Sequence, residues 1–161
     1  MLAAIDDADR IGNIYYSTRF NDTGRREWLW LLKQAAQEHD EQWLAEQVET
    51  NHLMRELEGG KTPRGGYAVR HIPRTASAET LAEGQFNRFY MLGLCRRAGQ
   101  EGIRELEVYR ARGTGSPRAE SEAMIGKRIP VREVERQLWD TKASLKSPLL
   151  KIRSGLSLRL P

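Results

Sequence analysis

Two glutamates in an alternating stretch are the residues whose types and spacing best suit chemistry. In IRELEVYRA, Glu105 and Glu107 alternate with Leu106 and Val108. Because successive side chains of a strand point to opposite faces, this pattern predicts a half-buried strand with both carboxylates outward. Metal-dependent nucleases combine such acids with a lysine to hold a divalent ion and activate water. No lysine follows at the required place, so we predict no catalytic residue and no metal site.

Arginines and lysines around the same stretch offer a different chemistry, the binding of anions. The planar guanidinium of arginine binds phosphate through two parallel hydrogen bonds. Two glycines and a proline between Arg112 and Arg118 give that loop the freedom to follow a phosphate backbone. No helix-turn-helix, zinc-finger or RNA-binding signature is present, so sequence-specific recognition is not expected. The residues predicted to contact nucleic acid are Arg88, Arg96, Arg97, Arg110, Arg112, Arg118, Lys127 and Arg128.

The remaining reactive side chains form no pattern. Cys95 is the only cysteine, so it forms no internal disulfide, and its hydrophobic surroundings predict a small buried apolar residue. His39, His52 and His71 do not lie one helical turn apart, which gives no support to a zinc site. We therefore expect no cofactor.

The charge of the chain is divided unevenly between its two parts. Residues 1–60 contain 6 Lys or Arg and 12 Asp or Glu, a net charge of −6; residues 61–161 contain 20 and 10, a net charge of +10, which together give the overall +4. An asymmetry of this kind points to nucleic acid or another polyanion. It is equally compatible with an acidic part that packs against a basic part, within one chain or between subunits.

The acidic part is predicted to be helical. Apolar residues recur at helical spacing from Arg25 to Glu58, as one long helix or as two helices divided by a break near His39 and Asp40. Gly59 with Gly60 would end this stretch. The tryptophans of this part carry more apolar surface than one helix buries unaided, which favours a subunit interface. The residues predicted at that interface are Trp28, Leu31, Leu32 and Trp43.

The basic part is predicted to be mixed α and β. Residues 59–76 form a Gly/Pro-rich linker or loop, in which the extended run at 67–72 would be a single edge strand. Ser77 then caps a central helix that reaches about Gln100, and Gly102 fits its stop. The inner face of this helix is expected to carry Phe86, Phe89, Tyr90, Gly93, Leu94 and Ala98, with Arg88, Arg96 and Arg97 outside.

Three further elements follow the strand that begins at Glu105. Residues 112–129 are expected to form a loop with one helical turn around residues 121–125. Pro130 would begin a third helix with Val131, Val134, Leu138 and Leu145 inward. The C-terminal residues alternate Leu156, Leu158 and Leu160 with polar residues, which suits a strand or an arm that docks on a neighbour.

The C-terminal half of the sequence resembles a group of bacterial proteins. The segment TLAEGQFNRFYMLGLCRRAGQEGIRELEVYRAR, together with PRAESEAMIGKRI and the closing SGLSLRLP, resembles uncharacterised proteins of bacterial and prophage genomes. The resemblance covers about residues 80–161 and leaves out the acidic part. It implies a virion structural, assembly or genome-handling role rather than metabolism, and it transfers no activity and no catalytic residues.

Together these observations predict one helix-rich α+β domain over residues 1–161, with a long acidic amphipathic helix, a central helix, a small sheet and an extended C-terminal tail. We expect a non-enzymatic structural or assembly protein of a phage or mobile element, self-associating, whose basic half contacts DNA, RNA or an acidic protein. The alternatives are a small metal-dependent nuclease or nucleotide-acting enzyme, and a regulator that binds another protein through the acidic helix. No membrane segment is expected, and the expected location is the cytoplasm or the virion.

Overall fold

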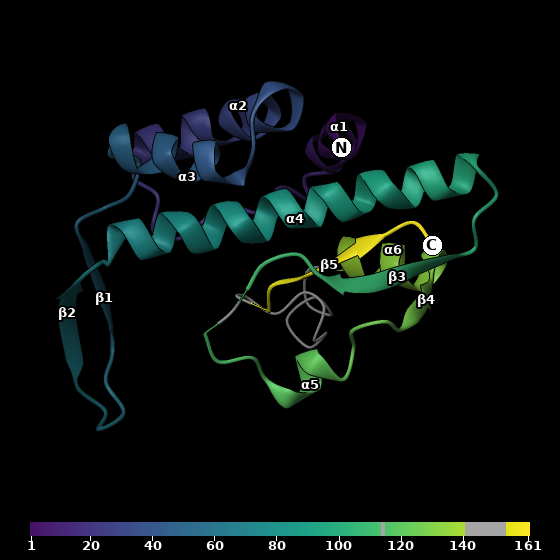
Figure 1. Cartoon of the computed structure of the whole chain (residues 1–161). Helices are drawn as coiled ribbons and strands as arrows, with labels where there is room; N and C mark the ends of the chain where they lie inside the picture. Colours follow the sequence, from purple (N-terminus) through teal and green to yellow (C-terminus); the bar gives the residue numbers. More distant parts are fainter. Residues whose placement is uncertain (114, 141–153) are drawn as a thin grey trace. The chain divides into compact units, whose positions relative to one another are not determined.

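The computed structural model of the protein describes residues 1–113, 115–140 and 154–161. It has the helix-rich α+β fold that the sequence predicts (Figure 1). Contacts within the chain define two compact units: unit 1 comprises residues 1–13 and 84–161, and unit 2 comprises residues 14–83. The boundary falls inside helix α4, Arg74–Gln100, and not at residue 60, where the net charge changes sign.

Unit 2 begins with two helices that replace one long helix. Helix α2 spans Asp22–Glu38 and α3 spans Glu41–Thr50, so the predicted break at residues 39–40 is confirmed. Asp40 causes it, because its carboxylate accepts a hydrogen bond from the backbone N–H of Trp43 at 2.8 Å and so caps the start of α3.

The end of α3 differs from the prediction, which extended the helix to Glu58. The backbone N–H of His52 donates to Glu49 O at 3.0 Å, and that of Leu53 donates to Val48 O at 3.1 Å. This pair of bonds, with His52 at φ +52°, is a Schellman motif. The helix stops here because a non-glycine residue adopts the left-handed conformation, which the sequence pattern does not reveal.

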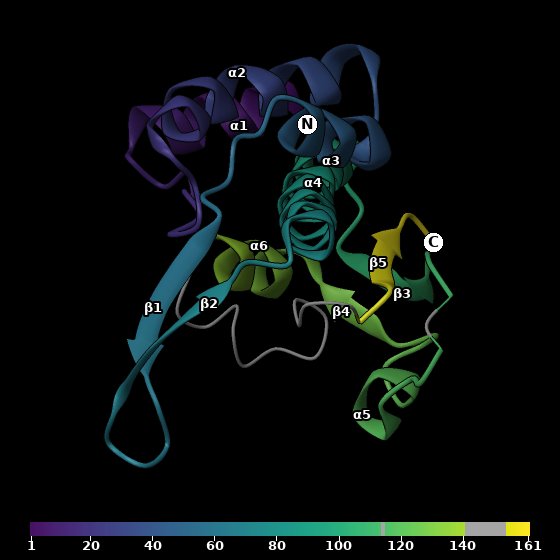
Figure 2. The same cartoon turned by 90° about the vertical axis from the view of Figure 1, so that its left-hand side faces the viewer.

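The predicted connection at 59–76 forms an antiparallel hairpin of β1, Leu57–Lys61, and β2, Tyr67–His71, rather than a loop with a single edge strand. Gly59 and Gly60, which were expected to stop a helix, lie in β1 opposite Val69 and Ala68. Figure 2 shows the hairpin extending away from helices α2 and α3 of its unit.

Helix α4 begins earlier than predicted. It starts at Arg74, directly after Pro73, and the backbone N–H of Ser77 already donates to Pro73 O at 2.9 Å. Ser77 is therefore not the cap of this helix. Its hydroxyl instead accepts a hydrogen bond from Arg19 Nη1 at 2.7 Å. The helix ends at Gln100, and Gly102 follows with φ +71°, as expected for its stop.

Unit 1 surrounds the second part of α4 with elements on more than one side. Helix α1, Leu2–Arg10, which the sequence analysis did not identify, buries Ala4, Ile5 and Ala8. Its start lies so close to α4 that a Cβ added at Gly93 would lie 2.6 Å from Met1 N. On another side, Asn87 of α4 donates to Leu156 O at 2.9 Å. The prediction of a single inner stripe is therefore wrong in part: Tyr90 is 39% exposed, whereas Met91 and Leu92, outside the predicted stripe, are buried.

The sheet of unit 1 has the strand order β4–β3–β5, and both pairs are antiparallel (Figure 1). Strand β3 spans Glu105–Arg110, with Leu106 and Val108 fully buried, so the predicted half-buried strand is confirmed. Strand β4 spans Arg128–Pro130, and β5 spans Leu156–Arg159. The C-terminal residues therefore form a strand of the chain's own sheet.

Two short helices complete unit 1. The predicted helical turn in the basic loop is α5, Ala119–Glu122, and the third helix is α6, Val131–Trp139, with Val134 and Leu138 buried. Pro130 is the N-cap of α6 rather than its first residue. Leu145 lies outside the described residues. No helix among the described residues has the length and apolar character needed to cross a bilayer.

Candidate nucleic-acid interface

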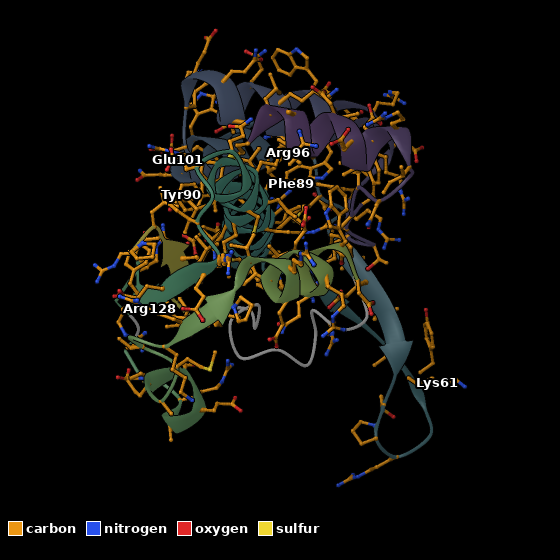
Figure 3. All side chains as sticks on the ribbon, turned by 90° about the vertical axis from the view of Figure 1, so that its right-hand side faces the viewer. Lys61, Phe89, Tyr90, Arg96, Glu101 and Arg128 are labelled. Carbon is orange, nitrogen blue, oxygen red and sulfur yellow. The ribbon has the colours of Figure 1, made fainter. Side chains whose placement is uncertain are left out.

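Lys127 and Arg128 form an exposed basic pair at the edge of the unit 1 sheet. The backbone N–H of Val108 donates to Lys127 O at 2.9 Å, and that of Gly126 donates to Val108 O at 2.8 Å, so this edge is fixed to the central strand. Both side chains are exposed, and neither forms an ion pair within the described ranges. Figure 3 labels Arg128 on β4. Since Glu107, the cross-strand neighbour of Arg128, pairs with Arg159 instead, both cations are available to an anion.

The two glutamates of β3 do not gather with other acids of the described residues into a group that could hold a metal ion. Glu107 lies between Arg128 of β4 and Arg159 of β5 in the strand register, and its carboxylate pairs with Arg159. Glu105 is exposed opposite Pro130. Within residues 1–113, 115–140 and 154–161, no group of three His, Cys, Asp or Glu side chains is close enough to hold a metal ion.

The basic loop before β4 is fixed by its backbone and by Arg110. Arg110 is half-buried, pairs with Glu122 of α5 and donates to Ser154 O at 3.2 Å. The carbonyl oxygen of Arg118 accepts from the N–H groups of the first turn of α5. Arg112 and Arg118 are exposed. Arg110 therefore holds the loop in place, and the two exposed arginines are the loop's candidate phosphate contacts.

Arg88 is buried, contrary to the prediction that it lies on the outside of its helix. Arg88 is 6% exposed. Its guanidinium donates hydrogen bonds to Leu138 O at 3.0 Å, to Asn13 O at 3.2 Å and to Asn13 Oδ1 at 3.3 Å. Burial lowers the pKa of this guanidinium. Arg88 thus connects α6 and Asn13, in the segment that follows α1, to α4, and it is not a surface contact for nucleic acid.

Arg96 and Arg97 lie on the surface of α4, as predicted, but both have acidic partners. Arg96 pairs with Asp7 of α1, and Arg97 Nε lies 2.7 Å from Glu101 Oε1. Figure 3 shows Arg96 and Glu101 on this part of the helix. Exposed ion pairs contribute little free energy, so both arginines can still exchange a carboxylate for a phosphate.

The residues predicted at a subunit interface lie mostly in the interior. Trp28 and Leu32 are 0% exposed and Leu31 is 1% exposed, and Trp28 Nε1 donates to Tyr15 O at 3.0 Å. They are buried within the chain itself, which corrects their assignment to an interface. Trp43 is half-buried and stacks on His39, with ring centroids 4.1 Å apart. The exposed tryptophan of α2 is Trp30, at 59%.

Cys95 is buried in α4, as its hydrophobic surroundings predict. Burial is the main cause that raises the pKa of its thiol to about 12, and the negative charge of Glu135 adds to the effect. The thiolate, which is the nucleophilic form, is therefore scarce at neutral pH.

A second set of exposed cations, which was not predicted from the sequence, lies on the β1–β2 hairpin. Lys61 and Arg64 lie at its tip, and neither has an ion pair in the part of the chain that the structure describes. The available signal was TPRGG, because Pro followed by Gly is typical of a tight turn between two extended runs.

No family model matches this chain, and neither the curated proteins nor the solved structures contain a significant match to it.

Proposed function

We propose that the protein is a non-enzymatic, self-associating structural or assembly protein that contacts nucleic acid through exposed cations of its basic part. The single observation that carries the proposal is the pair Lys127 and Arg128, which is exposed, fixed to the sheet edge and without an ion pair among the described residues. Two adjacent free cations beside a loop that carries Arg112 and Arg118 supply the electrostatic contact that binding to a phosphate backbone needs.

The phage or mobile-element setting rests on the resemblance of residues 80–161 to proteins of prophage genomes. A metal-dependent nuclease receives no support from β3, because Glu107 pairs with Arg159 and no third ligand stands near in the described ranges. The surface of α2 and α3 keeps its acidic residues outward, among them Glu38 and Glu46, so a protein partner of the acidic part stays an alternative.

The test is the salt dependence of binding to a labelled duplex DNA, measured by fluorescence anisotropy. Removing one phosphate contact should reduce the slope of log K against log salt by about 0.9. Lys127→Glu with Arg128→Glu should therefore flatten the slope by about 1.8. The matched control is Arg25→Glu with Arg26→Glu, which changes the net charge equally at two exposed positions of α2.

A flattened slope in the sheet-edge variant alone would support the proposal. An equal effect of the control would mean that net charge, not this surface, determines binding, and a wild-type protein that does not bind nucleic acid would refute the proposal.

Self-association is tested separately by light scattering on the purified protein. Trp30, 59% exposed on α2, is the apolar residue whose replacement should weaken a subunit contact of this helix. We expect a defined oligomer that Trp30→Ser shifts toward smaller species. A wild-type monomer at all concentrations would refute self-association without bearing on nucleic-acid binding.

A further inference from the structure

The β1–β2 hairpin is a ribbon that the rest of its unit does not cover. Every residue of its two strands is exposed except Glu58, which is partly exposed. An isolated two-stranded hairpin is marginal in water, so specific interactions must hold this one in place.

The turn at the tip supplies the first of these interactions. Thr62 N–H donates to Gly66 O at 2.8 Å, and Gly65 N–H donates to Thr62 O at 3.0 Å. Pro63 presets the turn, and Gly65 takes the left-handed conformation, with φ +82°. This turn places Arg64 at the tip of the ribbon.

The base of the ribbon is held by charge. Arg19 donates two hydrogen bonds of 2.8 Å to the two carboxylate oxygens of Glu58, and Arg70 Nε donates to Glu58 Oε1 at 3.0 Å. Such bidentate pairs are the strong form of the interaction between arginine and carboxylate. These bonds neutralise Glu58, the one acidic residue of the two strands, at the base of the ribbon. Lys61 and Arg64 at the tip have no acidic partner among the described residues.

The register places the exposed apolar side chains on one face of the ribbon. Tyr67 lies opposite Lys61, and Val69 lies opposite Gly59. Leu57, Tyr67 and Val69 are 46%, 74% and 61% exposed. The Tyr67 ring lies over Gly59, since a Cβ added there would collide with the tyrosine hydroxyl. One face is thus apolar and aromatic along the ribbon and ends in cations, and Figure 3 shows Lys61 pointing away from the ribbon.

We propose that the β1–β2 hairpin is a DNA-binding arm that lies in the major groove of duplex DNA, with Tyr67 and Val69 toward the bases and Lys61 and Arg64 on the phosphates. The major groove, about 12 Å wide, admits a two-stranded ribbon, whose strands lie about 4.8 Å apart. The positive tip complements the phosphates, and the apolar face gains burial against base edges. This inference rests on the proposed function, because both require the chain to bind nucleic acid.

The experiment measures binding of the whole chain to labelled duplex DNA, duplex RNA and single-stranded DNA over a range of salt concentrations. The arm variant is Lys61→Glu with Arg64→Glu, whose side chains are exposed and make no hydrogen bond within the described residues, so the fold should persist. It should reduce the salt slope on duplex DNA by about 1.8 and the affinity by about tenfold. The matched control is again Arg25→Glu with Arg26→Glu.

A second variant, Tyr67→Ser with Val69→Thr, separates apolar contact from charge. It should weaken binding to duplex DNA while leaving the salt slope unchanged, because it removes no phosphate contact. Duplex RNA should bind less tightly than duplex DNA, since the major groove of an A-form helix is too narrow for side chains to enter.

Four results would overturn the arm. An arm variant that behaves like the control, while Lys127→Glu with Arg128→Glu still lowers binding, would reject the arm and leave the proposed function standing. If the arm variant lost affinity for duplex RNA and single-stranded DNA as much as for duplex DNA, binding in the major groove would be rejected. An oligomer that either hairpin variant dissociates, with unchanged affinity for DNA, would assign the ribbon to a second copy of the chain. Absence of any binding by the wild type would reject both proposals.

Discussion

The described residues form two antiparallel sheets that are stabilised in opposite ways. In the β4–β3–β5 sheet, the central strand buries Leu106 and Val108 completely, so apolar burial holds it. In the β1–β2 ribbon, Tyr67 and Val69 are more than half exposed, and the turn and the pairing of Arg19 with Glu58 hold it. Secondary structure of one type can therefore serve as framework in one region and as exposed surface in another.

The largest effect should come from removing a core side chain of the sheet. Leu106→Ala deletes a fully buried side chain and should lower the free energy of unfolding by about 2 to 5 kcal/mol. Leu57→Ala is the same change on the exposed ribbon and should alter it by less than about 0.5 kcal/mol. Urea unfolding followed by circular dichroism measures both. Equal decreases in the free energy of unfolding of the two variants would show that Leu57 is packed as tightly as Leu106.

A smaller effect should separate the buried arginine from the exposed ones. Arg88→Met leaves the carbonyl groups of Leu138 and Asn13 without their donor and should cost about 1 to 3 kcal/mol. Arg128→Met, on the exposed sheet edge, should leave stability unchanged and weaken DNA binding. Urea unfolding measures the stability of both variants, and fluorescence anisotropy measures their binding to DNA. If Arg88→Met had normal stability but no longer bound DNA, Arg88 would have to be a nucleic-acid contact and not a structural residue.

The local stability of the β1–β2 ribbon should depend on its turn rather than on a hydrophobic core. Gly65 has φ +82°, so Gly65→Ala forces a Cβ into the left-handed region at a cost of about 1 to 2 kcal/mol. We expect faster amide exchange in β1 and β2 with unchanged global unfolding. Gly60→Ala, which meets no atom within 4 Å, is the control. A loss of global stability in Gly65→Ala would contradict the independence of the ribbon.

The smallest effect should be a pH dependence confined to the base of the ribbon. A side-chain hydrogen bond from Arg19 is the main cause that lowers the pKa of Glu58 from its usual value of 4.5. Because the folded-state pKa is the lower one, the contribution of this pair is complete above pH 4.5 and is lost as the pH falls through the folded value. Glu58→Gln should abolish that dependence in the amide exchange of the ribbon. Identical pH profiles of both proteins would remove Glu58 from this role.

Several elements could be predicted because their cause is local in the sequence. The alternation around Leu106 predicts β3, the break near His39 and Asp40 indicates the division between α2 and α3, and Gly102 marks the end of α4. The uneven distribution of charge also follows directly from the sequence. In each case the signal lies within a few residues of the feature it specifies.

Other features depended on contacts between residues far apart in the chain. Arg88 belongs to the interior because Asn13 and Leu138, which are distant in sequence, supply its acceptors. Trp28 is buried rather than at an interface: Phe20 packs against it, with ring centroids 5.3 Å apart, and Phe20 itself pairs with the distant Met54. The sequence by itself determined which residues carry charge and most of the helices. Only the tertiary structure decided which cations are free, because burial and ion pairing depend on the partners that folding brings together.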